Sequence, residues 1–139
     1  MTEPTLPLAV YGTLRRGERN HSLLAGATHV GDGLVAGVLH HVPAAPTRPY
    51  GFPALIAGGA GRVRVELYRL ADPGHWSTLD ALELYDPSDE AASEFLRRTV
   101  NVREGPIDRA QIYVYHGPLD VLGDIIGSGD WTAVRDRDS

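Results

Sequence analysis

The chain has 139 residues, of which 42% are hydrophobic and 22% are charged, and its formal net charge is -5. This is the composition of one ordinary globular domain, so we expect a single domain over residues 1–139 with an ordered core at about 7–131. The absence of cysteine excludes disulfides, a thiolate nucleophile and cysteine-ligated zinc. All 13 basic residues are arginine, which excludes lysine Schiff-base chemistry and the lysine-dependent phosphate loop.

Charge and hydropathy also argue against two classes of partner. The acidic balance lacks the basic stripe that a nucleic-acid or anionic-membrane surface requires. No apolar run approaches the roughly 20 residues that span a bilayer, and Met1–Leu8 lacks the charged and apolar regions of a signal peptide. We therefore expect a cytoplasmic protein that binds neither nucleic acid nor membrane.

The first third of the chain predicts a strand, a loop and a short helix. The apolar run Leu8–Tyr11 is typical of a buried strand, and it ends in the glycine-containing loop Gly12–Arg19. Asn20 is a suitable N-cap for a short helix over His21–Ala25, which Gly26 would end.

Two further strands are expected in the middle of the chain, over Leu34–Val42 and Val63–Leu70. In the second, apolar residues at 63, 65 and 67 alternate with charged ones, so one face is buried and the other meets solvent. The four prolines within Pro43–Pro53 predict a loop there.

The last part of the chain predicts one more helix and two more strands. Asp72 before Pro73 is typical of a helix start, and this helix should end before Pro87 after about three turns. Strands are expected over Arg97–Arg103 and Ala110–His116, and the last residues, 135–139, should be frayed. About six strands and two or so helices without regular alternation predict an α+β fold with a small, strongly curved or barrel-like sheet.

The predicted helix after Pro73 carries a carboxylate on its apolar face. Trp76, Leu79 and Glu83 are spaced by three and four residues and so share that face. An apolar setting raises the pKa of a glutamate and suits it to proton transfer near neutral pH. Two alternatives stay open: the carboxylate turns into solvent, or it pairs with Arg97 or Arg98.

The loop that follows the first strand is the second candidate. In Tyr11–Gly17, glycine directly after a buried strand lets the backbone approach a ligand, and successive free N–H groups can hold an anion or a developing oxyanion. A plain strand-to-helix connection explains the same pattern.

Other motifs do not support a site. Gly31, Gly33 and Ala36 fit a loose dinucleotide-binding pattern, but a strand follows where a helix is required. The adjacent His40 and His41 point to opposite faces of a strand and cannot bind one metal ion together. Ser128 lacks the frame of a nucleophile elbow. We expect neither a metal nor a cofactor.

Five short motifs, in order along nearly the whole chain, together resemble the γ-glutamylcyclotransferase-like (AIG2-like) family. Tyr11–Arg15 resembles the family's Y-G-[ST]-L signature, and Leu79–Glu83 is similar to its L-D-x-x-E segment. The remaining three are Phe95–Val102, similar to a Y-x-R-x-x-V-x-V strand, Ala110–Tyr115, similar to an A-x-[VI]-Y-V-Y strand, and Ser128–Trp131, similar to a closing G-D-W.

The resemblance implies a fold, a reaction and a set of residues. The free α-amine of a γ-glutamyl group would attack its own γ-carbonyl and release 5-oxoproline and an amine, without a metal or cofactor. Glu83 would be the general acid/base. The amides of Gly12, Thr13 and Leu14 would bind the small-molecule γ-glutamyl substrate and steady the oxyanion, with Tyr11 shaping the pocket. Arg97 would hold a carboxylate or pair with Glu83.

Two departures from the family pattern bear on activity. Leu84 stands where the family has glycine after the catalytic glutamate, and Phe95 stands where it has tyrosine. They leave open a domain that binds but does not turn over, and a metal-independent amidohydrolase is a further alternative. The loop at 43–53, with Arg48, Tyr50 and Phe52, would recognise the leaving amine or be a plain connection. The leaving amine and the oligomeric state, monomer or homodimer, stay open.

Overall fold

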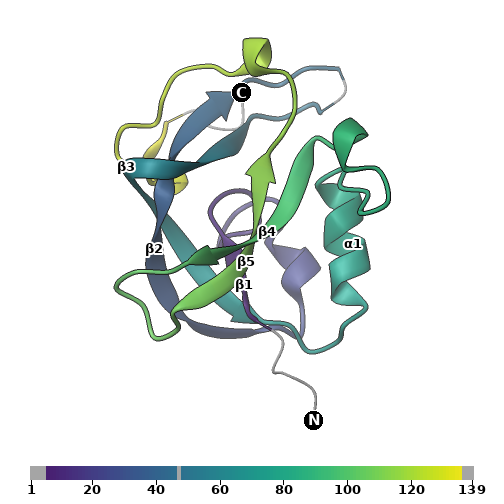
Figure 1. The fold of residues 1–139 in the computed structure, drawn as a ribbon, viewed down its shortest axis with the longest axis vertical. Coiled ribbons are helices and arrows are strands. Elements are labelled where there is room, and N and C mark those ends of the chain that lie inside the picture. Colours follow the sequence, from purple (N-terminus) through teal and green to yellow (C-terminus); the bar gives the residue numbers. More distant parts are fainter. Residues whose placement is uncertain (1–5, 47, 136–139) are drawn as a thin grey trace.

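The computed structural model describes residues 6–46 and 48–135, which form one five-stranded sheet, one α-helix and four single 3-10 turns (Figure 1). The strands are β1 (Leu8–Val10), β2 (Thr28–Val42), β3 (Phe52–Arg69), β4 (Phe95–Asn101) and β5 (Arg109–Tyr115). The helix is α1 (His75–Leu82), and the 3-10 turns are η1 (His21–Leu24), η2 (Glu90–Ala92), η3 (Leu119–Val121) and η4 (Trp131–Ala133).

The sheet is mixed, with the strand order β2-β3-β1-β5-β4. The short β1 lies in the middle, where it pairs antiparallel with β3 and parallel with β5. β2 and β3 form a long antiparallel hairpin, and β4 and β5 form a second one. Because β1 is central, the loop that leaves it emerges between the two hairpins.

The sheet curves until its two edges meet. The N–H of Leu34 in β2 donates to the carbonyl of Arg103, just after β4, at 2.8 Å, and the N–H of Arg103 donates back at 2.7 Å. The pairing of β2 with β3 also shifts register at 29/31 and at 36/37, and such bulges bend a strand. The barrel-like α+β fold predicted from the sequence is confirmed.

Two apolar clusters lie on the two faces of the sheet. Alternation along β1 sends Ala9 to one cluster, with the fully buried Trp131, and sends Leu8 and Val10 to the other. The second cluster also contains Leu79, which is fully buried and packs α1 against the sheet. This packing fixes the end of α1 beside the end of β1.

Several predicted boundaries were wrong. β2 begins at Thr28 and β3 at Phe52, well before the predicted starts, because long-range pairing in the hairpin includes glycine-rich segments that have little strand propensity of their own. The Gly31–Ala36 segment lies within β2, which confirms that it is no dinucleotide motif. Five strands are described where about six were expected.

The helix predictions also need correction. The segment after Asn20 is the 3-10 turn η1, and the Asn20 side chain does not cap it but donates to Thr13 Oγ1 at 2.9 Å. α1 begins only at His75, because Asp72 Oδ1 accepts the N–H of Gly74 at 2.7 Å in a tight turn before the helix, and it ends at Leu82 after two turns. Of the predicted frayed end, residues 136–139 lie outside the described residues.

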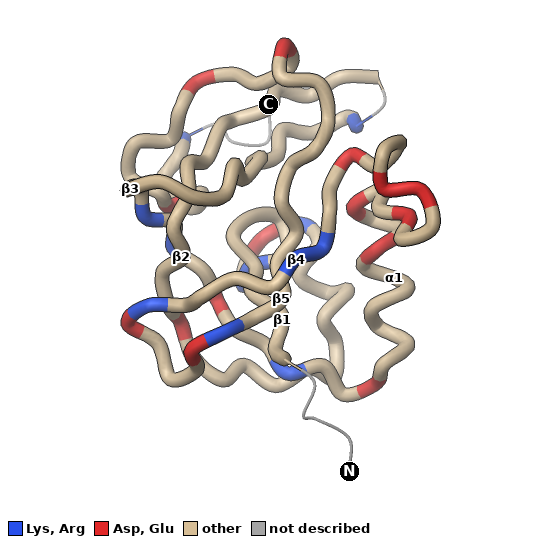
Figure 2. Tube along the Cα trace, in the orientation of Figure 1, with Lys and Arg blue, Asp and Glu red and all other residues tan. Residues whose placement is uncertain are grey.

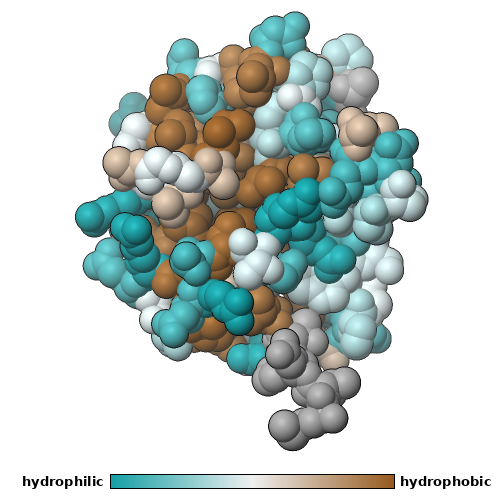
Figure 3. All heavy atoms as spheres, viewed as in Figure 1, coloured by the Kyte–Doolittle hydropathy of each residue, from teal (hydrophilic) through white to brown (hydrophobic). Residues whose placement is uncertain are grey.

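Exposed apolar side chains gather in the segment after β5. Leu119, Val121 and Ile125, after β5, are each more than two fifths exposed. Figure 3 shows hydrophobic residues in the upper part of this face, where the segment after β5 crosses the end of β2. No helix in the described part of the chain is long and apolar enough to cross a bilayer.

Candidate active site

A pocket opens where the end of β1, the end of α1 and the connection between β2 and β3 meet. One wall is the continuous segment 9–14, which leaves the middle of the sheet. The other lining residues are Arg48, Phe52, Pro53, Glu83, Phe95 and Tyr113. The pocket therefore contains the carboxylate and the glycine loop that the sequence singled out, together with Tyr11, Gly12, Thr13 and Leu14.

Glu83 is the C-cap residue of α1 and faces this pocket. Burial raises its pKa to about 7, since desolvation disfavours the charged form, and Glu94 adds to the rise while Arg48 opposes it. Its carboxylate has no hydrogen bond or ion pair to any side chain among residues 6–46 and 48–135. Near neutral pH this carboxylate can therefore both accept and donate a proton.

The two arginines considered as partners for Glu83 bind elsewhere. Arg97 Nη2 lies 3.6 Å from Asp80 Oδ2, and its guanidinium lies over the ring of Trp76. Arg98 forms two hydrogen bonds to Glu90, at 2.8 and 2.9 Å. Arg97 is outside the pocket lining, so the structure places this candidate apart from the other site residues.

The backbone turns sharply directly after Glu83. Leu84 has φ of +52°, in the left-handed region that favours glycine. Its N–H donates to the carbonyl of Ala81 at 3.3 Å, and the N–H of Tyr85 donates to that of Asp80 at 2.9 Å. These are the two bonds of a Schellman motif. Leu84 thus forms the helix-ending turn that suits glycine at this position.

The loop after β1 combines backbone donors that have no partner among the described residues with a position in the pocket wall. The carbonyls of Gly12 and Thr13 accept hydrogen bonds from the N–H groups of Arg15 and Asn20, at 3.0 and 2.8 Å. Nδ1 of His21 lies 2.9 Å from the carbonyl oxygen of Leu14. The N–H groups of residues 12–14 have no acceptor in the described part of the chain. Adjacent amides of this kind can bind an anion or an oxyanion.

Gly12 is required by the opposite wall. A Cβ built on Gly12 would collide with Cγ of Pro53 and would lie 2.8 Å from its Cδ. The backbone of the loop therefore lies directly against the proline ring at the start of β3. Because Gly12 has no side chain, the loop can pack against Pro53 and form part of the pocket wall.

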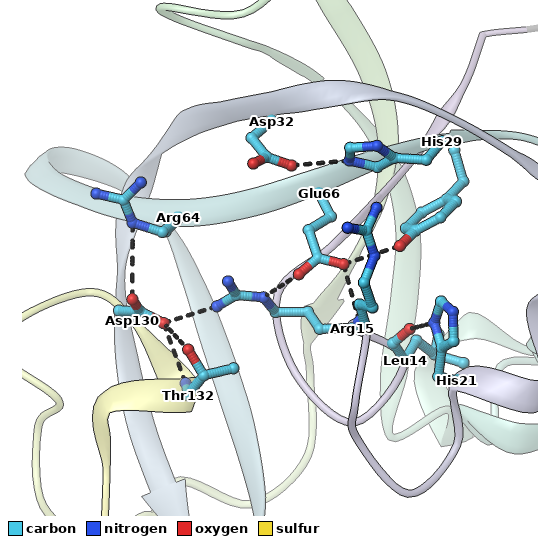
Figure 4. Close-up of polar contacts among 11 residues, drawn as sticks. Leu14, Arg15, His21, His29, Asp32, Arg64, Glu66, Asp130 and Thr132 are labelled. Carbon is cyan, nitrogen blue, oxygen red and sulfur yellow. Dashed lines mark hydrogen bonds and ion pairs between the residues drawn. The ribbon is translucent and has the colours of Figure 1, made fainter.

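An ionic network behind the pocket fixes the loop (Figure 4). The buried Arg15 donates from Nε to Glu66 Oε2 at 2.9 Å and from Nη1 to Asp130 Oδ1 at 2.7 Å. Oε1 of Glu66 accepts the N–H of Arg16 and the hydroxyl of Tyr68, both at 2.9 Å. These contacts hold the pKa values of Glu66 and Asp130 below their usual range. The network joins the loop to β3 and to the turn before η4.

Two tyrosines connect the floor of the pocket to α1. The hydroxyl of Tyr11 donates to the carbonyl of Tyr113 at 2.6 Å, and the hydroxyl of Tyr113 donates to Asp80 Oδ1 at 2.6 Å. Burial raises the pKa of both phenols. Both are therefore neutral hydroxyls at physiological pH, and Tyr11 is held in place as a pocket wall.

Aromatic and charged side chains from distant segments complete the pocket wall. Phe95 is almost fully buried and meets Tyr115 edge to face at 5.4 Å between ring centroids. Arg48 and Phe52, from the loop that was predicted to recognise the leaving amine or to be a plain connection, both line the pocket. Tyr113 and Glu94 were not considered, and the alternation of apolar residues in β5 is the signal that could have placed Tyr113. No three His, Asp or Glu side chains of the described residues are arranged to hold a metal ion.

Comparisons with solved structures agree with this architecture. The uncharacterized protein PH0828 from Pyrococcus horikoshii has a TM-score of 0.68 at 22% identity, with 94% of this chain and 93% of that chain covered. YkqA from Bacillus subtilis has a TM-score of 0.67 at 26% identity, and 94% of this chain covers only 40% of that one. An AIG2-like protein from Mus musculus has a TM-score of 0.57 at 25% identity, with 86% and 83% covered.

Comparison with sequence families gives the assignment. Among curated protein sequences, none matches the chain significantly. The model of the family described as gamma-glutamyl cyclotransferase, AIG2-like, matches residues 8–133, which include every element from β1 to η4. The chain belongs to the gamma-glutamyl cyclotransferase, AIG2-like family.

Proposed function

We propose that the protein is a γ-glutamyl cyclotransferase that releases 5-oxoproline and a free amine from a γ-glutamyl amine, amino acid or larger metabolite. One observation carries the proposal: Glu83, without a counter-ion among the described residues, faces the same pocket as the unbonded amides of residues 12–14. A proton acceptor and an oxyanion site on one pocket are what acyl transfer to a tethered amine requires.

The reaction needs no external nucleophile. The α-amine nitrogen forms a bond to the γ-carbonyl carbon, and the amide bond from that carbon to the leaving nitrogen breaks. Closing a five-membered ring gains from proximity, because the amine is already attached to the acyl group. The task of the protein is to orient the glutamyl chain, move one proton and stabilise one oxyanion.

Glu83 performs the proton transfer in this proposal. Its carboxylate takes a proton from the attacking amine, and the resulting carboxylic acid gives that proton to the leaving nitrogen, so that water is neither consumed nor released. The amides of Gly12, Thr13 and Leu14 bind the γ-glutamyl end and the tetrahedral oxygen. Each oxyanion donor contributes about 3–4 kcal/mol of transition-state stabilisation.

A mass-spectrometric screen tests the proposal. Purified protein is incubated with γ-glutamyl amines, γ-glutamyl amino acids, glutathione and γ-glutamylated aminoglycosides. Formation of 5-oxoproline with one class, together with a stoichiometric amount of amine, supports the proposal and identifies the substrate class. Release of glutamate would show hydrolysis by water, and binding of 5-oxoproline without turnover of any substrate would show a binding domain; either result contradicts the proposal.

A further inference from the structure

Arg48 is the one basic side chain among the described residues that line the pocket. Its side chain is only 11% exposed, and Nη2 lies 3.0 Å from Oε1 of Glu94. Its guanidinium lies 4.4 Å from the ring centroid of Phe52 and 5.8 Å from that of Phe95. One carboxylate and two aromatic faces thus hold this cation on the aromatic wall.

Glu94 reaches Arg48 from outside the pocket. It lines a neighbouring surface depression with Leu84 and His116. The N–H of Glu94 donates to the carbonyl of Leu84 at 3.0 Å, and its carbonyl accepts the N–H of His116 at 2.7 Å. Because Leu84 follows Glu83 directly, these bonds fix the Glu94 backbone relative to the turn that carries Glu83.

Two carboxylates lie in the electrostatic field of this one guanidinium. Arg48 is close enough to Glu83 to oppose the rise of its pKa, yet no ion pair joins the two side chains. Arginine binds carboxylates strongly and favours bidentate contact. Figure 2 shows acidic residues gathered in the segment that follows α1.

We propose that Glu94 is a positioning residue for the candidate base: by pairing with Arg48 it holds the guanidinium against Phe52 and Phe95 and keeps it from forming an ion pair with Glu83. The inference rests on the proposed function of Glu83. An ion-paired carboxylate is a weaker base, so an Arg48–Glu83 pair would hold Glu83 in the charged state and weaken proton transfer.

The other groups near Glu83 are neutral or already paired. Tyr11, after β1, and Tyr113, on β5, are phenols whose pKa values burial raises. Asp80, on α1 itself, accepts a hydrogen bond from Tyr113 and pairs with Arg97. Arg48, from the connection between β2 and β3, and Glu94, before β4, are therefore the charges that govern the ionisation of Glu83.

Four variants test the inference: E94Q, R48Q, the double variant E94Q/R48Q and, as a matched control, E90Q. Glu90 also follows α1 and pairs with an arginine, Arg98, at 2.8 Å. It lines neither the pocket nor the neighbouring surface depression. The titration of the Glu83 carboxyl carbon is followed by ¹³C NMR in substrate-free protein, with the signal assigned by its absence in E83Q. The pH dependence of kcat/KM is measured in parallel.

In E94Q we expect the midpoint of the Glu83 titration to fall by about one pH unit or more, because Arg48 turns to Glu83. The acidic limb of kcat/KM moves down with it, and the plateau of kcat/KM above this limb falls by up to about tenfold per pH unit as the base weakens. E90Q leaves both unchanged. R48Q raises the midpoint, and does so by more in the E94Q background than in wild type, because only there does the guanidinium contact Glu83.

Equal effects of R48Q in the two backgrounds would overturn the inference, since Glu94 would then act only as a distant charge. An unchanged midpoint in E94Q would overturn it as well. The NMR titration requires no turnover, so it separates the inference from the proposed function. If the effects of R48Q differ between the two backgrounds but no substrate yields 5-oxoproline, the arrangement of charges is supported and the proposed function is contradicted. If 5-oxoproline is released but the effects of R48Q are equal, the proposed function is supported and the inference is contradicted.

Discussion

Arg15 and Glu66, which are 51 residues apart in the chain, meet behind the candidate site in a hydrogen bond of 2.9 Å between Nε and Oε2. Both residues are buried, and Glu66 also accepts the N–H of Arg16. The pair therefore anchors the backbone of the loop after β1 to β3. The position of the free amides at 12–14 depends on this anchor.

Replacing Arg15 by methionine tests the anchor. The variant leaves Glu66 as a buried charge without its cation, which costs about 3–5 kcal/mol in the free energy of unfolding. The matched control is Arg98→Met, which removes one partner of an exposed pair and costs about 1 kcal/mol or less. Urea unfolding followed by circular dichroism measures both values, and a loss for Arg15→Met no larger than that of the control would contradict the anchoring role.

The raised pKa of Glu83 predicts a cost in stability at high pH. The pKa of about 7 means that the folded protein keeps the Glu83 proton up to about pH 7, whereas the unfolded chain loses it near the ordinary glutamate pKa of 4.5. Between these values unfolding releases a proton, so the free energy of unfolding falls as pH rises through this window. Glu83→Gln removes the effect. We expect the free energy of unfolding of this variant, relative to that of wild type, to increase by about 1–3 kcal/mol from pH 4 to pH 8.

Thermal or urea unfolding of wild type and Glu83→Gln at both pH values checks this. A difference between the two proteins that stays constant with pH would show that Glu83 titrates normally in the folded state. The pocket would then not raise the pKa of Glu83 as the account requires.

Gly12→Ala tests the close approach of the loop to β3. The added methyl collides with the Pro53 ring, and overpacking of this kind costs about 1–3 kcal/mol. The value of kcat/KM should fall by more than the loss of folded protein explains, because the free amides move with the loop. The control is Gly127→Ala, where an added Cβ meets nothing within 4 Å. Recovery of stability in Gly12→Ala/Pro53→Ala would confirm the cause, and its absence would show that glycine is needed for another reason.

Leu84→Gly tests the turn after Glu83. A left-handed leucine costs about 1–2 kcal/mol, and glycine recovers part of this while adding backbone entropy to the unfolded chain. Because the Leu84 side chain is 55% exposed, little packing is lost. The variant should be as stable as wild type or more stable by up to about 1 kcal/mol, and should keep the pH dependence of turnover. A loss above about 1 kcal/mol, measured by urea unfolding, would show that Leu84 stabilises the turn by contacts.

Local patterns located the individual parts of the candidate site. The spacing of Trp76, Leu79 and Glu83 predicted a carboxylate on the buried side of a helix, and the structure places Leu79 in the core and Glu83 on the pocket. The strand and loop around Gly12 were likewise visible, because an apolar run that stops at glycine is a short-range signal.

Contacts between distant segments were not predictable from such patterns. Arg48 comes from a proline-rich connection, and its partner Glu94 lies 46 positions later in the chain. Neither has a periodicity that marks it, because their meeting depends on how the sheet curves. The same holds for Arg97, whose pairing with Asp80 depends on how α1 packs beside β4.

The central claim is that Glu83 is the general acid/base of a cyclisation. The most direct measurement compares kcat/KM for 5-oxoproline release by wild type, Glu83→Gln and a control, Glu104→Gln, on whichever substrate class the screen identifies. Glu104 is exposed in the turn between β4 and β5 and does not line the pocket. We predict a loss of about 10²–10⁴-fold in Glu83→Gln with binding of 5-oxoproline retained, and no loss in the control. Turnover by Glu83→Gln within a few fold of wild type would contradict the account.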